Sequence, residues 1–459
     1  MNPYFRIVRV AAAVAALSVP VPSFAGGSRF VRTAPSVSAE MLSPSFWESL
    51  DKKAGEVILS ADEILAVGKE AASAAENDEM SFFHYASGRN GSVTQSALLA
   101  FLDADVPERC YKDGDVVPDD LRKRLSASRN LSAVGESNPV SYGVILRRGN
   151  VRLLPTDEIL TGEEFALSHD ILQAGIVMMS EPVVVLHSTA DSSWHFVVSA
   201  TCRGWVPDEN LAFCHNFAEW DKCRNPADFL VVTESRFSLD HDRLNARISG
   251  AELFLGTKLA LVPYAEWGES AEGREGYDCY IVRIPDKSQG GFLMFHNAYV
   301  PCSRSVSVGY VPYTRANLLR ISFSCLGERF GWRGMYGARD DAQFVTELYR
   351  VFGFDVPRSV SGIAAMDVPT IGMRSSTSSH KKSLLKYVPA GSILVAGNRV
   401  LLYLGTYGGE QYALSASESD VLPGGRTART MGVSVLPLSA GIPSAGTLAD
   451  EISAVKVMY

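Results

Sequence analysis

The sequence lacks three features that would place it quickly in a class. It contains no run of basic residues, and its net charge of −8 argues against a surface that binds nucleic acid, because nucleic-acid phosphates require basic side chains. It contains no CxxC or similar close spacing, so it predicts no metal site and no cofactor. Beyond the N-terminal region it has no apolar run long enough to cross a bilayer, which predicts no transmembrane segment.

Cysteine is present but scattered. The closest pair in the sequence is Cys214 and Cys223, which an oxidising compartment could join. Burial as small apolar residues is an equally good interpretation of all of them. The full set has an odd number of members, so at least one is unpaired within a monomer: Cys110, Cys202, Cys214, Cys223, Cys279, Cys302 and Cys325.

The first residues have the pattern of a secretory signal peptide. Arg6 and Arg9 precede a short apolar run, and Ser23-Phe24-Ala25 is a small-x-small cleavage pattern. The sequence therefore predicts a signal peptide over residues 1–25 and export to the periplasm or cell envelope. Residues 26–40 are rich in Ser, Gly and Ala and are predicted to form a linker.

A chain of 459 residues is too long for one ordinary core, which predicts about three or four domains. Residues 41–136 show helical spacing of apolar residues, with Asp62 as a candidate helix cap, and are predicted to form a helical N-terminal module. Residues 137–227 and 228–312 contain short strand-like runs separated by turn clusters. The two segments end alike, with Gly204-Trp205-Val206-Pro207 in the first and Gly309-Tyr310-Val311-Pro312 in the second.

The last segment, residues 313–459, mixes both kinds of element. Phe344, Leu348, Val351 and Phe352 are spaced for one face of a helix over residues 341–352. Residues 315–326 form a second helix-like run. Strands are predicted over residues 392–396, 400–404, 411–414 and 433–436, which makes this segment an α+β domain.

Several short motifs follow one another over some 270 residues. They are Asn150-Val151-Arg152, Leu154-Pro155-Thr156, His169 to Gln173, Glu181-Pro182-Val183, the two Gly-aromatic-Val-Pro closes, Gly331 to Asp340 (GWRGMYGARD), Pro357-Arg358-Ser359 and Arg399 to Gly405. In this order they resemble the multidomain NlpC/P60 family, and the likeness covers most of the chain after residue 25. The resemblance implies a helical module, two small SH3-like β-barrels and a C-terminal papain-like α+β domain.

In active family members, as the resemblance implies, a Cys at the head of a helix attacks the γ-D-glutamyl-diamino acid bond of peptidoglycan stem peptides. A His on the next strand activates that Cys, and a third polar residue orients the His. These positions fall on Asp341, Arg399 and Ser415 in this chain. A guanidinium stays protonated and cannot act as a base. The resemblance therefore implies a non-catalytic member that binds peptidoglycan stem peptides or another envelope protein.

Six residues around these positions are candidates for ligand binding. The resemblance implies that Asp340 binds a free amine of the stem peptide, although capping of the following helix explains an Asp there equally well. Asp341 and Arg399 are also predicted to form an ion pair. For the aromatic residues Trp332 and Tyr336, packing within the loop is the alternative to ligand binding. The candidates are Asp340, Trp332, Tyr336, Arg339, Arg358 and Ser359.

Two other functions remain open from the sequence. One is an active cell-wall peptide hydrolase with rearranged residues, for which Cys325 and His380 are the candidate pair, although the apolar run around Cys325 indicates core. The other is a scaffold that regulates an active paralogue. Adjacent carboxylates such as Asp340 and Asp341 diverge on a helix, which argues against a metal-dependent hydrolase.

Overall fold

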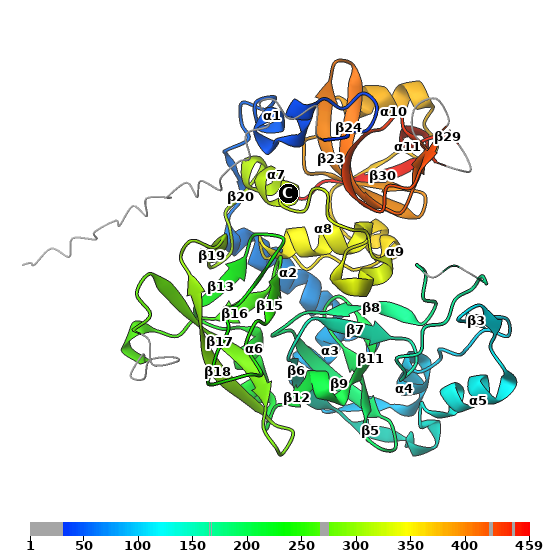
Figure 1. Ribbon diagram of the computed structural model, residues 1–459, viewed down its shortest axis with the longest axis vertical. Helices are drawn as coiled ribbons and strands as arrows, with labels where there is room; N and C mark the ends of the chain where they lie inside the picture. The colour runs from blue at the N-terminus through cyan, green and yellow to red at the C-terminus, as the bar shows by residue number, and fades with distance from the viewer. Residues whose placement is uncertain (1–30, 165, 167, 267–274, 422–425, 443–445) are drawn as a thin grey trace, which may run out of the picture.

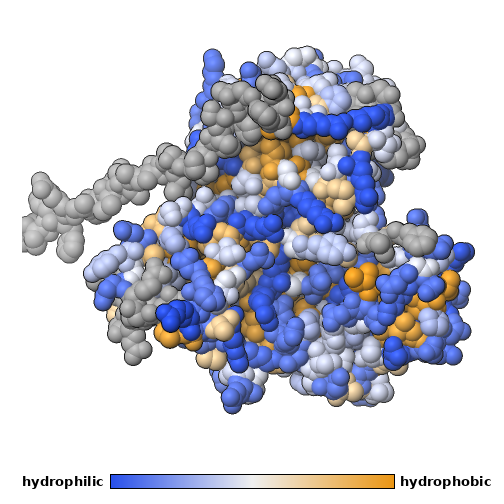
Figure 2. Space-filling model, in the orientation of Figure 1, coloured by the Kyte–Doolittle hydropathy of each residue, from blue (hydrophilic) through white to orange (hydrophobic). Residues whose placement is uncertain are grey.

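The computed structural model describes residues 31–459 except 165, 167, 267–274, 422–425 and 443–445. The predicted signal peptide lies outside the described residues. In Figure 1 a sheet with flanking helices forms the upper part of the molecule, two β modules form the lower part, and helix α8 lies between them. Figure 2 shows hydrophilic side chains gathered at the level of α8 on the visible face.

The N-terminal segment is mainly helical, as predicted, but its helices do not share one core. Trp47 and Ile64 pack in the core of the C-terminal domain, Leu98 packs with the first β module, and Leu121 packs against Leu154. The elements are η2 Ala39–Leu42, α1 Pro44–Glu48, β1 Val57–Leu59, α2 Ala61–Ala75, α3 Phe82–Ala86, β2 Ser92–Thr94, α4 Gln95–Phe101, β3 Tyr111–Lys112, β4 Asp115–Val116, α5 Asp119–Ala127 and η3 Leu131–Ala133.

The described part of the predicted linker is packed against the C-terminal domain. Val37 is buried in the same core as Trp47. The Tyr412 hydroxyl donates a hydrogen bond of 2.9 Å to the Ser36 carbonyl. Val57 and Leu59 of β1 pair with Thr314 and Tyr313 of β20 (Tyr313–Thr314), so residues near the start of the described chain complete the last domain.

The first β module is a seven-stranded sheet in the order β12-β6-β9-β10-β11-β7-β8. Side chains alternate along β9: Val183 and Val185 enter one core, while Val184 and Leu186 enter another that also holds Trp205. The elements are β5 Ser137–Pro139, β6 Ser141–Ile145, β7 Gly149–Arg152, β8 Gln173–Val177, β9 Pro182–Ser188, β10 Trp194–Val198, β11 Arg203–Pro207, η4 Asp208–Asn210, β12 Leu211–Phe213 and α6 Phe217–Arg224.

The second β module has its own core, around Leu230, Val232 and Val282. The shared Gly-aromatic-Val-Pro close differs in detail between the modules, because Trp205 is fully buried inside its sheet whereas Tyr310 packs edge-on against Phe229 at 4.9 Å. The elements are β13 Phe229–Val232, β14 Arg236–Ser238, β15 Glu252–Phe254, β16 Lys258–Ala260, η5 Tyr264–Glu266, β17 Cys279–Lys287, β18 Leu293–Pro301 and β19 Val306–Val308.

The C-terminal domain is built on a six-stranded sheet in the order β21-β30-β22-β23-β24-β27. Leu402 and Leu404 of β23 point to one face, where α7 and α8 pack, whereas Leu401 and Tyr403 point to the face covered by α10 and α11. The elements are β20, α7 Arg315–Phe323, η7 Trp332–Gly337, α8 Asp341–Arg350, α9 Val360–Ala365, β21 Thr370–Gly372, α10 Ser378–Leu385, β22 Ile393–Ala396, β23 Arg399–Tyr407, β24 Glu410–Ser417, β25 Asp420–Val421, β26 Thr427–Ala428, β27 Gly432–Pro437, β28 Gly441–Ile442, β29 Gly446–Thr447, α11 Leu448–Glu451 and β30 Ile452–Lys456.

Two kinds of feature are absent from the described residues. Among the helices within these residues, none combines the length and apolar character needed to cross a membrane. The same part of the chain contains no group of three or more His, Cys, Asp or Glu side chains arranged to hold a metal ion.

Candidate functional site

Helix α8 begins at the centre of the candidate site. Asp340 is its N-cap, and its Oδ1 accepts a hydrogen bond of 2.8 Å from the Gln343 amide. The carboxylate thus satisfies one of the free amides that every helix start exposes. The apolar spacing predicted for this helix buries Phe344 and Leu348 against the sheet, which fixes the orientation of the helix start.

The glycine-rich loop before α8 can only be built from glycine at key points. Gly334 has a φ of +85°, and a Cβ at this position would lie 2.4 Å from Ile176 Cγ2 on β8. A Cβ on Gly331 would lie 2.3 Å from the carbonyl oxygen of Met335. Arg333 and Tyr336 also have positive φ, a region that side chains other than glycine rarely adopt. The loop is therefore held in one tight shape.

The loop rests on the first β module through motif residues. Arg333 Nη1 donates to the Gln173 carbonyl at 2.8 Å, and Gln173 Nε2 donates to the Arg333 carbonyl at 3.3 Å. Behind them, the buried Arg152 side chain pairs with Asp170 and with Gln173 Oε1. Motifs that are distant in the sequence therefore meet in one polar network that supports the loop.

A cavity of about 1000 Å³ lies at the start of α8, between the C-terminal domain and the β10–β11 hairpin of the first β module. Five of the predicted residues line it: Trp332, Asp340, Asp341, Arg358 and Ser359. Its lining within the described residues includes no histidine. Four others are not part of the lining: Tyr336, Arg339, Arg399 and Ser415.

Asp341, at the predicted nucleophile position, joins α8 to the neighbouring strand. Its Oδ2 accepts a hydrogen bond of 2.7 Å from the Val400 amide, and its Oδ1 accepts one of 2.9 Å from the Ala342 amide. Burial and the adjacent Asp340 carboxylate raise the pKa of Asp341 to about 7, although the two amide hydrogen bonds and Arg399 act in the opposite direction. The side chain serves as a link between two elements.

Arg399 does not form the predicted ion pair with Asp341. Its Nη1 lies 2.9 Å from Asp420 Oδ1, and its Nη2 donates to Ser415 Oγ at 2.6 Å. Asp420 and Ser415 are both fully buried, so a cation has a better partner there than at the cavity edge. Arg399 and Ser415, at the positions predicted for the base and for the third polar residue, thus lie together, and neither lines the cavity.

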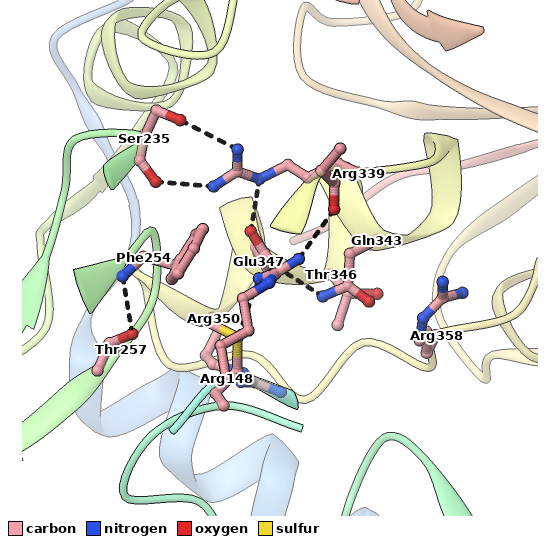
Figure 3. Close-up of polar contacts among 12 residues, drawn as sticks. Arg148, Ser235, Phe254, Thr257, Arg339, Gln343, Thr346, Glu347, Arg350 and Arg358 are labelled. Atoms are coloured by element: carbon pink, nitrogen blue, oxygen red, sulfur yellow. Dashed lines mark hydrogen bonds and ion pairs between the residues drawn. The ribbon is translucent and has the colours of Figure 1, made fainter. Parts of the chain in front are cut away.

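Arg339 belongs to a buried charge network and does not face the cavity, which argues against ligand binding by this residue. It is 2% exposed, and its Nε donates to Glu347 Oε2 at 2.5 Å, while Nη2 donates to the Ser235 carbonyl at 2.8 Å (Figure 3). Arg148 also pairs with Glu347. Although burial opposes it, the charges of Arg148 and Arg339 lower the pKa of Glu347 to about 2. The network joins both β modules to α8.

Arg358 binds the second oxygen of the Asp340 carboxylate, which caps α8. Its Nη2 lies 3.0 Å from Asp340 Oδ2, which also accepts a hydrogen bond from the Arg333 amide at 3.0 Å. Both oxygens of Asp340 are therefore engaged within the chain, so helix capping is confirmed for this residue. The predicted binding of an amine at Asp340 has to compete with Arg358.

The remaining predicted residues have different surroundings. Trp332 packs edge-on against His169 with ring centroids 4.6 Å apart and forms a wall of the cavity. Tyr336 is 60% exposed and lies outside it. Ser359 caps α9, because its Oγ accepts from the Gly362 amide at 3.0 Å, and it also borders the cavity.

The structure does not bring Cys325 and His380 to the cavity. Cys325 is fully buried in the core, and His380 is exposed at the start of α10. The cysteine that does line the cavity is Cys202, on the β10–β11 hairpin, which sequence reasoning missed. Burial raises the pKa of Cys202 to about 11, which leaves it as a thiol of low reactivity.

Comparison with known proteins supports the architecture. A family model for an SH3 domain of the SH3b1 type matches residues 161–207. A novel NlpC/P60 endopeptidase from Photobacterium damselae subsp. piscicida aligns with a TM-score of 0.66 and 15% identity over 88% of this chain and 94% of that one. An NlpC/P60 family protein from Bacillus cereus aligns with a TM-score of 0.49 and 14% identity over 69% of this chain and 99% of that one. No curated protein sequence matches the chain.

The chain is therefore a multidomain α+β protein that combines an SH3 domain with an NlpC/P60-like fold. The SH3 match lies within the first β module, and the fold assignment rests on the structural alignment with the Photobacterium enzyme. This confirms the predicted fold class and the predicted resemblance.

Proposed function

We propose that the chain is an exported cell-envelope protein that binds peptidoglycan stem peptides in the cavity beside Asp341 without cutting them. An SH3 domain together with an NlpC/P60-like fold supports an association with the cell wall. The predicted export from residues 1–25 is consistent with that location. In the same proposal, the domains span residues 41–136, 137–227, 228–312 and 313–459.

One observation carries the non-catalytic part of the proposal. The carboxylate of Asp341 sits at the start of α8, where a nucleophile would profit from the helix dipole, and both its oxygens accept backbone hydrogen bonds. A carboxylate cannot carry out the thiolate chemistry of a cysteine nucleophile. The described lining also contains no histidine that could activate another nucleophile. The only thiol in that lining, Cys202, has a raised pKa.

Incubation of the full chain with synthetic stem peptides tests this proposal. We expect no release of the diamino acid product by mass spectrometry, together with co-sedimentation of the chain with purified sacculi. Cleavage that disappears in Cys202→Ala or Cys325→Ala would contradict the proposal and favour a rearranged hydrolase. Failure to sediment and to bind stem peptides would favour a scaffold for another envelope protein.

A further inference from the structure

The charged residues of the cavity are mostly cationic. Its lining within the described residues includes Arg203, Arg333, Arg358 and Arg374 but only two carboxylates, those of Asp340 and Asp341. The whole chain, by contrast, has a net charge of −8. A concave surface with excess positive charge in an acidic protein attracts anionic groups.

The two carboxylates are not available to a ligand. Asp340 accepts from the Gln343 amide, the Arg333 amide and Arg358 Nη2. Asp341 accepts from the Ala342 and Val400 amides. An incoming ammonium group would have to displace Arg358 from a side chain that is itself largely buried, and that would leave a buried guanidinium without its partner, which is costly.

Arg358 has donors to spare. It is only 7% exposed, and its Nε is buried against Gly175, out of reach of a ligand. Its Nη2 is its one hydrogen-bonding nitrogen among the described residues. The nitrogen left for a ligand is therefore Nη1. Arg333 likewise commits its Nη1 to Gln173. Burial, together with the nearby charge of Arg358, lowers the pKa of Arg333. An anion beside these two guanidinium groups satisfies idle donors and offsets their mutual repulsion.

We propose that the cavity takes a carboxylate of the peptide ligand at Arg358 and Arg333, beside the wall formed by Trp332, and not an amine at Asp340. The planar fork of a guanidinium matches a carboxylate and holds it by two parallel hydrogen bonds. Arg374, whose side chain is exposed at the cavity rim, adds long-range attraction. The inference rests on the proposed function, because it specifies how the same cavity recognises its peptide.

Titration calorimetry of the full chain with three versions of one stem peptide tests the inference. We expect amidation of the peptide carboxylates to weaken binding at least about tenfold, as the loss of a charge-assisted pair does. Acetylation of its free amine should change the affinity less than about twofold. The opposite ranking overturns the carboxylate site and leaves the proposed function intact. Absence of binding by the unmodified peptide overturns both.

Three variants refine the test. Arg358→Lys keeps a cation beside Asp340 but loses the planar fork, so binding of the unmodified peptide should fall about tenfold. Arg374→Gln removes an exposed charge and should weaken binding about two- to fivefold. Arg236→Gln removes an exposed arginine of β14, outside the cavity, and should bind as the wild type does. Wild-type affinity in all three variants overturns the inference. If Arg358→Lys does not fold, the comparison of Arg374→Gln with Arg236→Gln decides it.

Discussion

At the scale of single residues, Asp341 combines a structural and an electrostatic effect. It ties the start of α8 to β23 through the Val400 amide, yet it lies next to another carboxylate in a partly buried position. A cysteine could not accept this hydrogen bond with comparable strength, because sulfur is a weak acceptor. The aspartate at this position therefore links the helix to the sheet.

We predict that Asp341→Asn stabilises the chain above neutral pH and not at pH 4. The folded-state pKa of Asp341, about 7, is raised above the ordinary value of 3.8. The stability contributed by its protonated form is therefore complete below pH 3.8 and is lost as the pH rises through 7. Asn carries no charge and keeps an acceptor for the Val400 amide, but it loses the hydrogen bond that Asp341 accepts from the Ala342 amide. Urea unfolding should show a gain on the order of 1–3 kcal/mol at pH 8.

The control for this prediction is Asp62→Asn, an exposed residue in the first turn of α2. Its effect on unfolding should be small at both pH values. An Asp341→Asn effect of equal size at pH 4 and pH 8 would show that the carboxylate is not the titrating group.

At the scale of elements, the loop η7 and helix α8 act as one unit. The loop is anchored on β8 by Gln173, and the helix is anchored by Asp340, by Asp341 and by the buried ion pairs of Glu347. Figure 3 shows Arg148 and Arg339 approaching Glu347 from different segments. The cavity wall is thus preorganised by contacts on its rear side.

We predict that Gly334→Ala destabilises this unit by about 1–3 kcal/mol. The new Cβ has to fit at a φ of +85° and lies 2.4 Å from Ile176 Cγ2. Urea unfolding and peptide binding should both be weakened. Gly372→Ala on the exposed strand β21 has open space around its Cβ and should change the unfolding free energy far less. Equal effects of the two substitutions would show that the loop relaxes around the added methyl group.

The elements that sequence predicts best are those whose side chains repeat. The spacing of Phe344 and Leu348 predicted α8, and the strand-like runs at residues 392–396 and 411–414 predicted β22 and β24. For the cavity, the sequence predicted lining residues only in the C-terminal domain. Cys202 enters it from a hairpin about 140 residues earlier in the chain, and no local pattern contains that pairing.

Charge partners were the least predictable feature. Arg399 was expected to pair with Asp341, but the fully buried Asp420 is nearer to its guanidinium. Arg339 was expected at a ligand, but it pairs with Glu347, which lies on α8 and is fully buried. The ion-pair partner of a long side chain depends on which charges lie near it in the folded chain and on how buried they are. Neither can be read from separation in the sequence.

At the scale of the whole molecule, the N-terminal segment acts as a strap on the C-terminal domain. Trp47 is 1% exposed, its Nε1 donates to the Met41 carbonyl at 2.8 Å, and its ring lies 5.4 Å from that of Tyr412. Segments at the two ends of the described chain thus share one hydrophobic core.

We predict that Trp47→Ala destabilises the C-terminal domain by about 3–5 kcal/mol, because a large buried ring leaves a cavity. Hydrogen exchange followed by mass spectrometry should show faster exchange in β23 and β24 and little change in β9 and β10. Leu50→Ala, at a side chain that is 45% exposed, is the matched control and should leave the exchange pattern unchanged. Protection of β24 that survives Trp47→Ala would contradict the role of the strap.

The strap also sets an order of events during folding. The hydrogen bond between Tyr412 and Ser36 spans 376 residues, so this core cannot close until almost all of the polypeptide has been synthesised. Contacts of such long range form slowly, because the entropy of closing the loop is lost before the contact is gained. The first β module, whose core is built from residues closer in sequence, is free to fold earlier. Refolding of variants that keep a single tryptophan should therefore show the fluorescence of Trp205 reaching its final value before that of Trp47.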